Sequence, residues 1–220
     1  ELLQRGSGKT LDVGCGTGKL TELLLQSGAR VLGIEPNQEM REAGERLLEA
    51  QPRFVSIAAT AEATTLLDQC VDLIVAGQAF HWFDPERSRA EFVRMLKPAG
   101  WVALIWNDRR TDSTPFLTAY EALLRRFATD YEKVNHRNID ASALRQFFRG
   151  APELRKFRCT QSFDFEGLKG RLLSSSYAPE AGQPQHEGML THLREIFAAH
   201  QRDGQVVFEY DTLVYFGRLA

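Results

Sequence analysis

The sequence predicts an α/β fold, in which an open and mostly parallel sheet carries helices on both faces. Apolar runs that are typical of buried strands alternate with helical patterns up to Trp106. A glycine-rich turn, "GCGTG", directly follows the first apolar run. The final run, from Val206 to Leu219, alternates apolar and polar residues, which is typical of an antiparallel strand at an edge of the sheet.

The first half of the chain supplies five strands, each an apolar run bounded by turn residues. We expect these strands at residues 9–13, 30–34, 54–58, 71–76 and 101–106. We expect the intervening helices, where apolar residues recur at helical spacing, at residues 19–26, 36–50 and 85–96. In an open α/β sheet, ligands bind beyond the carboxyl ends of the strands, which is where the glycine-rich turn lies.

The second half is mostly helical, with two alternating runs that we interpret as strands. The expected helices are at residues 116–131, 168–174 and 188–200, and the expected strands are at residues 154–165 and 206–219. We interpret residues 1–220 as one domain with two tasks. Residues 1–107 bind the main ligand, and helical cap segments at 108–150 and 165–202 shape a second pocket.

Composition excludes several classes of protein. The chain has 220 residues, of which 43% are hydrophobic and 25% charged, enough for one sizeable core. The net charge of −2 gives no reason to expect nucleic acid as a partner. Three scattered cysteines without a CxxC pair argue against disulfides and a metal site, and favour a cytoplasmic setting. No apolar run approaches the ~20 residues of a membrane span.

The start of the chain also carries an expectation. The sequence begins at Glu1 without a methionine, almost directly at the first strand. We expect that an N-terminal segment has been lost, cleaved or left out.

The glycine-rich turn and the acids around it indicate a nucleoside ligand. Gly14, Gly16 and Gly18 let the backbone approach a ligand closely, and the helix after them directs unpaired N–H groups at the same space. Glu35 ends the second strand, where an acid can accept both hydroxyls of a ribose.

The glycine spacing separates two classes of nucleoside ligand. The fingerprint for nicotinamide dinucleotides is GxGxxG, and its third glycine would fall at Lys19. Asp12, two residues before the turn, would repel a pyrophosphate but attract an ammonium and a sulfonium. The pattern therefore favours S-adenosylmethionine.

Several motifs in sequence order resemble the class I S-adenosylmethionine-dependent methyltransferases, in particular their type 11 methyltransferase domain. These motifs are "LDVGCGTGKLT", "VLGIEPNQEM", "ATAEATTL", "CVDLIVAGQAFHWFD" and "EFVRMLKPAGWVALI". The resemblance covers Lys9 to Trp106 and implies a Rossmann-like sheet of seven strands in the order 3-2-1-4-5-7-6. It also implies a methyltransferase that is a monomer or homodimer. The "HWF" run is similar to methyltransferases of small carboxylic acids, such as trans-aconitate methyltransferase.

The resemblance implies a set of cofactor-binding residues. They are Asp12, Gly14, Cys15, Gly16, Thr17, Gly18, Glu35, Pro36, Asn37, Met40, Thr60, Ala61, Glu62, Gly77, Gln78 and Ala79. Cys15 is expected to fill space within the turn rather than to react. Thr60 departs from the pattern, since many relatives carry an aspartate at that position, so the contact of this loop to adenine stays open.

The acceptor side of the site rests on weaker signals. Methyl transfer needs a base only if the acceptor must lose a proton, and His81 is the candidate base, with packing as the plainer role. Trp82 and Phe83 could wall off the sulfonium or pack in the core. Candidate substrate-binding residues are His81, Trp82, Arg109, Arg110 and Tyr177. His136 and Arg137 could either contact the substrate or be solvated charges, while Arg125 and Arg126 are more readily solvated charges.

These patterns predict a methyltransferase of a small-molecule acceptor, with a carboxylate oxygen as the first candidate. Nitrogen or carbon methylation of a ring or quinone-like acceptor stays open. A cofactor-binding regulatory protein without turnover is the alternative outside enzymes. An oxidoreductase that uses NAD lacks its third glycine here, and no Asn-Pro-Pro-Tyr-like motif of nucleic-acid methyltransferases follows the fourth strand, which ends in "GQAF".

Overall fold

The computed structural model describes residues 8–129, 131, 141–175 and 177–219. The chain divides into two compact units. The first unit contains residues 1–106, 139–155 and 213–220, and the second contains residues 107–138 and 156–212. Each unit has its own hydrophobic core, so each is described by itself.

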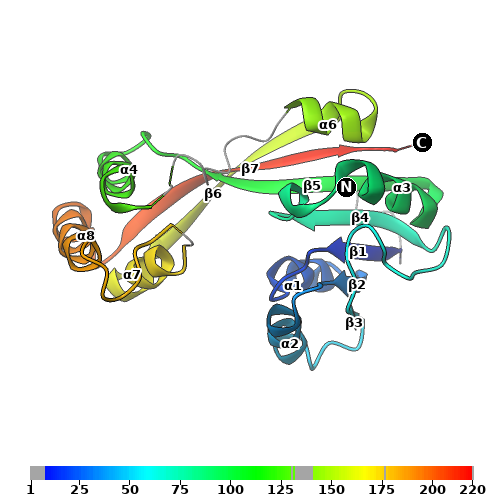
Figure 1. Cartoon of the computed structure of the whole chain (residues 1–220), viewed down its shortest axis with the longest axis horizontal. Helices are drawn as coiled ribbons and strands as arrows, with labels where there is room; N and C mark the ends of the chain where they lie inside the picture. Colours follow the sequence, from blue (N-terminus) through cyan, green and yellow to red (C-terminus); the bar gives the residue numbers. More distant parts are fainter. Residues whose placement is uncertain (1–7, 130, 132–140, 176, 220) are drawn as a thin grey trace. The chain divides into compact units, whose positions relative to one another are not determined.

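A seven-stranded mixed sheet runs in the order β3-β2-β1-β4-β5-β7-β6, which confirms the predicted topology (Figure 1). Its strands are β1 (Lys9–Val13), β2 (Arg30–Ile34), β3 (Phe54–Ile57), β4 (Val71–Gly77), β5 (Leu96–Arg109), β6 (Glu153–Phe163) and β7 (Val206–Gly217). The first five pair in parallel, and Leu11 of the central strand β1 lies opposite Leu32 and Ile74. The carboxyl ends of β1, β2 and β4 therefore share one edge of the sheet.

The described helices of the first unit are α1 (Lys19–Gln26), α2 (Gln38–Leu47), α3 (Pro85–Met95), α6 (Ala141–Phe148) and the short 3₁₀ helix η2 (Phe80–Trp82). Polar side chains cap the starts of α2 and α3. α2 starts two residues later than Pro36 because the Asn37 side chain accepts the amide of Met40 as its N-cap. Asp84 caps α3 in the same way, accepting the amides of Glu86 and Arg87.

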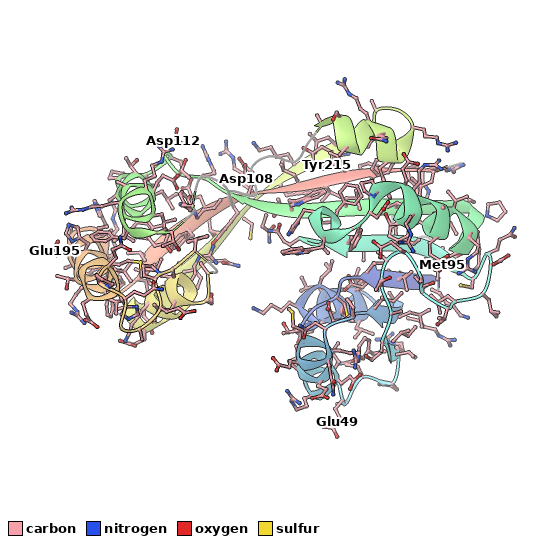
Figure 2. All side chains as sticks on the ribbon, in the orientation of Figure 1. Glu49, Met95, Asp108, Asp112, Glu195 and Tyr215 are labelled. Atoms are coloured by element: carbon pink, nitrogen blue, oxygen red, sulfur yellow. The ribbon has the colours of Figure 1, made fainter. Side chains whose placement is uncertain are left out.

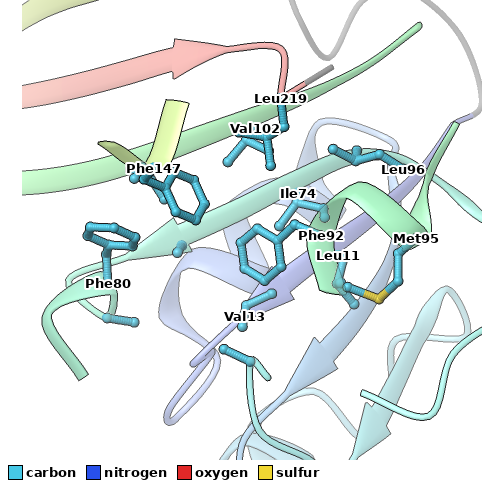
Figure 3. Close-up of a cluster of buried hydrophobic side chains, with 14 of the residues drawn as sticks. Leu11, Val13, Ile74, Phe80, Phe92, Met95, Leu96, Val102, Phe147 and Leu219 are labelled. Carbon is cyan, nitrogen blue, oxygen red and sulfur yellow. The ribbon is translucent and has the colours of Figure 1, made fainter. Parts of the chain in front are cut away.

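The two faces of the sheet are buried under different helices. Ile74 and Ala76 of β4 pack in one cluster with Phe92 and Met95 of α3 (Figure 3). Leu73 and Val75 alternate with them and pack instead in the cluster that contains Leu24 and Leu25 of α1. A strand apolar on both faces is what the run "VDLIVA" predicts for a parallel sheet.

Phe147 and Phe148 of α6 correct one expectation from the sequence. These rings lie in the segment 108–150 that we expected to form a helical cap, but they belong to the core of the first unit. Phe147 packs edge-on against Phe80, with 4.8 Å between ring centroids, and against Phe92 at 5.8 Å (Figure 3). Arg89 of α3 fixes α6 further by donating to the Phe147 carbonyl over 2.8 Å.

The second unit combines helices with the adjoining parts of the last strands. Its helices are α4 (Pro115–Phe127), α7 (Phe165–Leu173) and α8 (His186–His200). Its core is rich in aromatic rings and centres on Phe208 of β7, which packs edge-on against Phe116 and Tyr120. No helix in the described part of the chain is long and apolar enough to cross a membrane.

Candidate functional site

The glycine loop between β1 and α1 has a backbone that side chains disfavour. Gly14, Gly16 and Gly18 have φ values of 69°, 56° and 83°, all in the left-handed region. A Cβ at Gly14 would lie 2.6 Å from the Cβ of Ala79, and one at Gly18 would lie 2.9 Å from Leu48 Cδ1. The loop therefore requires glycine at these positions both for conformation and for space. Thr17 lies within it, half-buried.

Helix α2 packs directly on this loop through Gly44, which the sequence reasoning missed. A Cβ at Gly44 would lie 3.2 Å from the carbonyl oxygen of Gly16 and 3.3 Å from the carbonyl carbon of Thr17. The signal was present, because a lone glycine within a helical pattern often marks a close approach. The loop is also tied to β2, since the amides of Gly14 and Cys15 both donate to the Ile34 carbonyl.

Glu35 joins the glycine loop to the start of α2. Its Oε2 accepts the amide of Gly16 and its Oε1 accepts the amide of Asn37, each over 2.9 Å. The side chain is buried, and the residue is only 7% exposed. A carboxylate offers about four acceptor positions, so each oxygen keeps one for another donor. Two oxygens, each with a spare position, fit the adjacent hydroxyls of a ribose.

Asp12 places a buried carboxyl group beside the same loop. Oδ2 accepts a 2.6 Å hydrogen bond from the Thr21 hydroxyl, and Oδ1 has no hydrogen-bond partner among the described residues. The pKa of Asp12 is raised to about 7, mainly by burial and to a smaller extent by Glu35, while the bond from Thr21 opposes the shift. An orphaned acid at this position fits a cationic ligand group, which would complete its contacts.

Cys15 is packed within the glycine loop. The pKa of its thiol is raised to about 12, mainly by burial and also by the nearby carboxylates of Asp12 and Glu35. The sulfur also fills space against β2, because it lies 3.0 Å from where a Cβ on Gly33 would stand. A protonated, packed thiol is no nucleophile.

Other predicted cofactor-binding residues lie in the segments that follow β2 and β3. Pro36 and Met40 are exposed, and the Met40 methyl lies 3.2 Å from the place a Cβ on Gly16 would take. In the loop after β3, Ala61 is buried and Thr60 exposed. Glu62 Oε1 accepts the amide of Asp84 over 2.9 Å, so this acid ties the loop after β3 to the loop after β4.

The loop after β4 turns sharply where the strand ends. Gln78 adopts a φ of 56°, which is uncommon for a residue with a side chain and marks strain at the mouth of the site. Its amide donates to the Ile105 carbonyl, which anchors the turn to β5. A Cβ on Gly77 would lie 2.8 Å from Leu20 Cδ2, and Ala79 is buried against Gly14.

The "FHWF" residues that follow divide between core and surface. Phe80 is buried, whereas His81 is exposed and Trp82 is 79% exposed. The ring centroids of His81 and Trp82 lie 4.8 Å apart. Trp82 therefore has no core role. Phe83 lies nearer the glycine loop, because a Cβ on Gly14 would stand 3.7 Å from its ring.

The predicted substrate residues of the second unit already have protein partners. Arg109 donates to Glu121 Oε2 over 2.6 Å and to the Tyr131 hydroxyl over 2.9 Å. The Tyr131 ring lies 5.1 Å from that of Tyr177, so Tyr131 contacts both Arg109 and Tyr177. Arg110 instead pairs with Glu209 at 3.4 Å. The structure thus separates two arginines that are neighbours in sequence.

The arginines predicted to be solvated are only partly described. Arg125 is 60% exposed and pairs with Glu121 at 3.4 Å, and Arg126 contacts His192 at 3.0 Å on the surface. His136 and Arg137 lie outside the described residues.

Comparison with known proteins decides the family. Over 212 residues the chain is 36% identical to an uncharacterised methyltransferase of Schizosaccharomyces pombe, a match that covers 93% of this chain and 81% of the relative. The family described as a methyltransferase domain matches residues 11–104. The chain belongs to the class I S-adenosylmethionine-dependent methyltransferases.

Other methyltransferases match part of the chain. An uncharacterised methyltransferase of Mycobacterium bovis is 41% identical over 108 residues, which make up 49% of this chain and 43% of the relative. The chain thus spans less than half the length of this curated relative. An uncharacterised methyltransferase of Mycobacterium tuberculosis gives the same values.

Solved methyltransferases share the fold. A protein of Anaeromyxobacter dehalogenans assigned as a type II methyltransferase aligns with a TM-score of 0.75 at 22% identity, covering 99% of this chain and 93% of that one. Geranyl diphosphate C-methyltransferase of Streptomyces coelicolor, solved with S-adenosyl-L-homocysteine, aligns at 0.50 and 16% identity, covering 95% and 69%. At these identities the likeness concerns the methyltransferase fold alone.

Proposed function

We propose that this methyltransferase binds S-adenosylmethionine at the glycine loop and transfers its methyl group to a small-molecule acceptor. The observation that carries the proposal is Asp12, whose buried Oδ1 has no partner among the described residues and lies beside the loop. A dinucleotide would bring a pyrophosphate anion to this acid, whereas the methionine part of S-adenosylmethionine brings an ammonium group. The buried carboxyl group of Asp12 therefore favours S-adenosylmethionine over a dinucleotide.

Each residue of the loop has a distinct task in this proposal. Glu35 accepts the two ribose hydroxyls on its spare acceptor positions while it keeps its bonds to Gly16 and Asn37. Asp12 pairs with the ammonium group and Thr21 holds its carboxyl in place. Because Glu35 holds Gly16 of the glycine loop while it binds the ribose, the cofactor and the loop stabilise each other.

The chemistry asks little of the protein beyond positioning. S-adenosylmethionine supplies a methyl group activated by the sulfonium. We infer that a carboxylate oxygen is the acceptor, since it already carries the electron pair that forms the new C–O bond and has no proton to lose. Such an acceptor requires no general base, which agrees with His81 lying exposed on the short helix η2. Orientation and exclusion of water then supply most of the rate enhancement.

Formation of S-adenosylhomocysteine in the presence of acceptors tests the proposed function. The acceptors are benzoate, phenylacetate and trans-aconitate, each set against its amide. We expect turnover with at least one carboxylate and a product that mild base hydrolyses, as a methyl ester would be. A product stable to base would show nitrogen or carbon methylation instead. Cofactor binding without turnover on any acceptor would favour a regulatory protein.

The matched variants of this assay are Asp12→Asn and His81→Gln. Asp12→Asn should abolish turnover because it removes the partner of the ammonium group. His81→Gln should retain turnover to within about tenfold, because general-base catalysis typically contributes 10²–10⁴-fold and a carboxylate does not need it. A loss of about 10³-fold in His81→Gln would contradict a carboxylate acceptor.

A further inference from the structure

Arg171 places a cation among aromatic rings in the core of the second unit. The residue lies in the last turn of α7 and is half-buried. Its guanidinium carbon lies 5.0 Å from the ring centroid of Phe208, 5.4 Å from that of Tyr210 and 5.8 Å from that of Phe163. Three rings around one guanidinium hold it in a fixed orientation, because its planar group stacks on them.

Among the described residues, no acid compensates the charge of Arg171. In the part of the chain that the structure describes, no carboxylate forms an ion pair with its guanidinium. The neighbouring cation Arg109 differs, since it pairs with Glu121 at 2.6 Å. Arg109 also stacks on Tyr120, at 5.2 Å from the ring centroid. The aromatic core thus contains two arginines, of which Glu121 neutralises one.

The acids on β7 do not neutralise Arg171, because they lie on the opposite face of the strand from Phe208 and Tyr210. Phe208 and Tyr210 lie on one face of the strand, and Glu209 and Asp211 alternate with them. Glu209 pairs with Arg110, and Asp211 pairs with Lys156 at 2.8 Å. Neither acid of this part of β7 therefore shares the face that carries the two rings, and Arg110 and Lys156 pair with them instead.

Tyr210 adds a hydrogen-bond donor that lacks an acceptor. The residue is 5% exposed, and its buried hydroxyl has no partner among the described residues. Burial raises the pKa of Tyr210, although Arg171 and Arg109 act in the opposite direction, so the phenol is protonated at neutral pH and can donate. A buried hydroxyl left unpaired destabilises the fold, and a ligand oxygen would complete its hydrogen bonding.

We propose that Arg171 and Tyr210 form an anion-recognition site that binds the carboxylate of a small molecule with an apolar or aromatic body. The guanidinium supplies the charge, the Tyr210 hydroxyl supplies a second donor, and the rings of Phe163 and Phe208 supply apolar contact. This inference concerns the second unit alone and goes beyond the proposed function. It adds two residues that the sequence motifs did not indicate.

Titration with benzoate and with benzamide, its neutral analogue, tests the site. We expect the wild-type protein to bind benzoate and to bind benzamide at least about tenfold more weakly, since a charge-assisted hydrogen bond contributes about 1.5–3 kcal/mol. Arg171→Met, which keeps an apolar contact with the rings, should lower benzoate affinity at least about tenfold. Arg194→Met is the matched control, because Arg194 also stacks on a ring, that of Phe165, but lies exposed on α8.

Tyr210→Phe separates recognition from folding. Removal of an unpaired buried hydroxyl should leave the unfolding midpoint unchanged or raise it, while benzoate affinity falls several-fold. A parallel titration with S-adenosylhomocysteine should be unaffected by any of these variants, so a failure of cofactor binding is distinguished from a failure of this site. Absence of benzoate binding, or equal binding by wild type, Arg171→Met and Tyr210→Phe, would overturn the proposal.

Discussion

The backbone amide of Gly16 donates a 2.9 Å hydrogen bond to Oε2 of Glu35. Through this bond the acid that ends β2 holds the glycine loop that follows β1, and its other oxygen holds the start of α2. One carboxylate thus ties the glycine loop to the segment between β2 and α2, which lies 19 residues further along the chain. The loop is preorganised by the same group that we propose receives the ribose.

Asp12→Asn should make the folded protein more stable at neutral and alkaline pH. The pKa of Asp12 is raised to about 7 in the folded state, above its ordinary value of 3.8. Between these values the folded state holds a proton that the unfolded state has lost, so the free energy of unfolding falls as pH rises from about 4 to 7. Asparagine does not ionise, so it removes this loss of stability, which amounts to at most about 4 kcal/mol above pH 7.

Denaturant unfolding of both proteins at pH 5 and pH 8 measures this effect. The gain in stability should be small at pH 5 and large at pH 8, yet S-adenosylhomocysteine should bind the variant at least about tenfold more weakly. A variant that is less stable than wild type at pH 8 would contradict the account of Asp12 as an uncompensated acid.

Gly44→Ala should weaken cofactor binding although it suits a helix. Its new Cβ would stand 3.2 Å from the Gly16 carbonyl oxygen and so push the glycine loop away from α2. Gly170→Ala is the matched control, because Gly170 also lies within a helix but has no atom within 4 Å of the added carbon. The control should raise stability by about 0.5–1 kcal/mol and leave binding unchanged.

The two glycine variants are compared by calorimetric titration with S-adenosylhomocysteine. We expect a loss of several-fold in affinity for Gly44→Ala. If both variants bind as wild type does, the close approach of α2 has no part in shaping the loop.

Cys15 should resist alkylation, whereas Cys159 should react. The Cys15 thiol is partly buried and burial raises its pKa to about 12, so almost no thiolate is present at pH 8. Cys159 is exposed on β6. Mass spectrometry after treatment of the native protein with iodoacetamide should find the label on Cys159 well before Cys15. Rapid labelling of Cys15 would show that the loop opens readily.

The sequence predicts the first unit well because its signals are local. Buried parallel strands are short apolar runs, and the glycine loop, Asp12 and Glu35 lie at fixed positions relative to them. The strands and helices of this half accordingly begin and end within a few residues of their predicted limits, except β5, which extends from Leu96 to Arg109.

Long-range contacts set the limit of sequence reasoning in the rest of the molecule. Helical spacing does not reveal that α6 packs on α3, nor that Glu121 lies against Arg109. Arg171 was not singled out, because its neighbours Phe208 and Tyr210 are almost forty residues away along the chain. A cation among rings is recognisable only once the fold has brought them together.

Calorimetric titration with S-adenosylhomocysteine tests the central claim most directly. We expect the wild-type chain to bind it and not NAD, and Glu35→Ala to bind at least about tenfold more weakly, since both the ribose acceptor and the tie to Gly16 are lost. Glu49→Ala is the control, because Glu49 is exposed just beyond the end of α2 and projects away from the sheet (Figure 2). Binding of NAD, or equal binding by wild type and Glu35→Ala, would contradict the account.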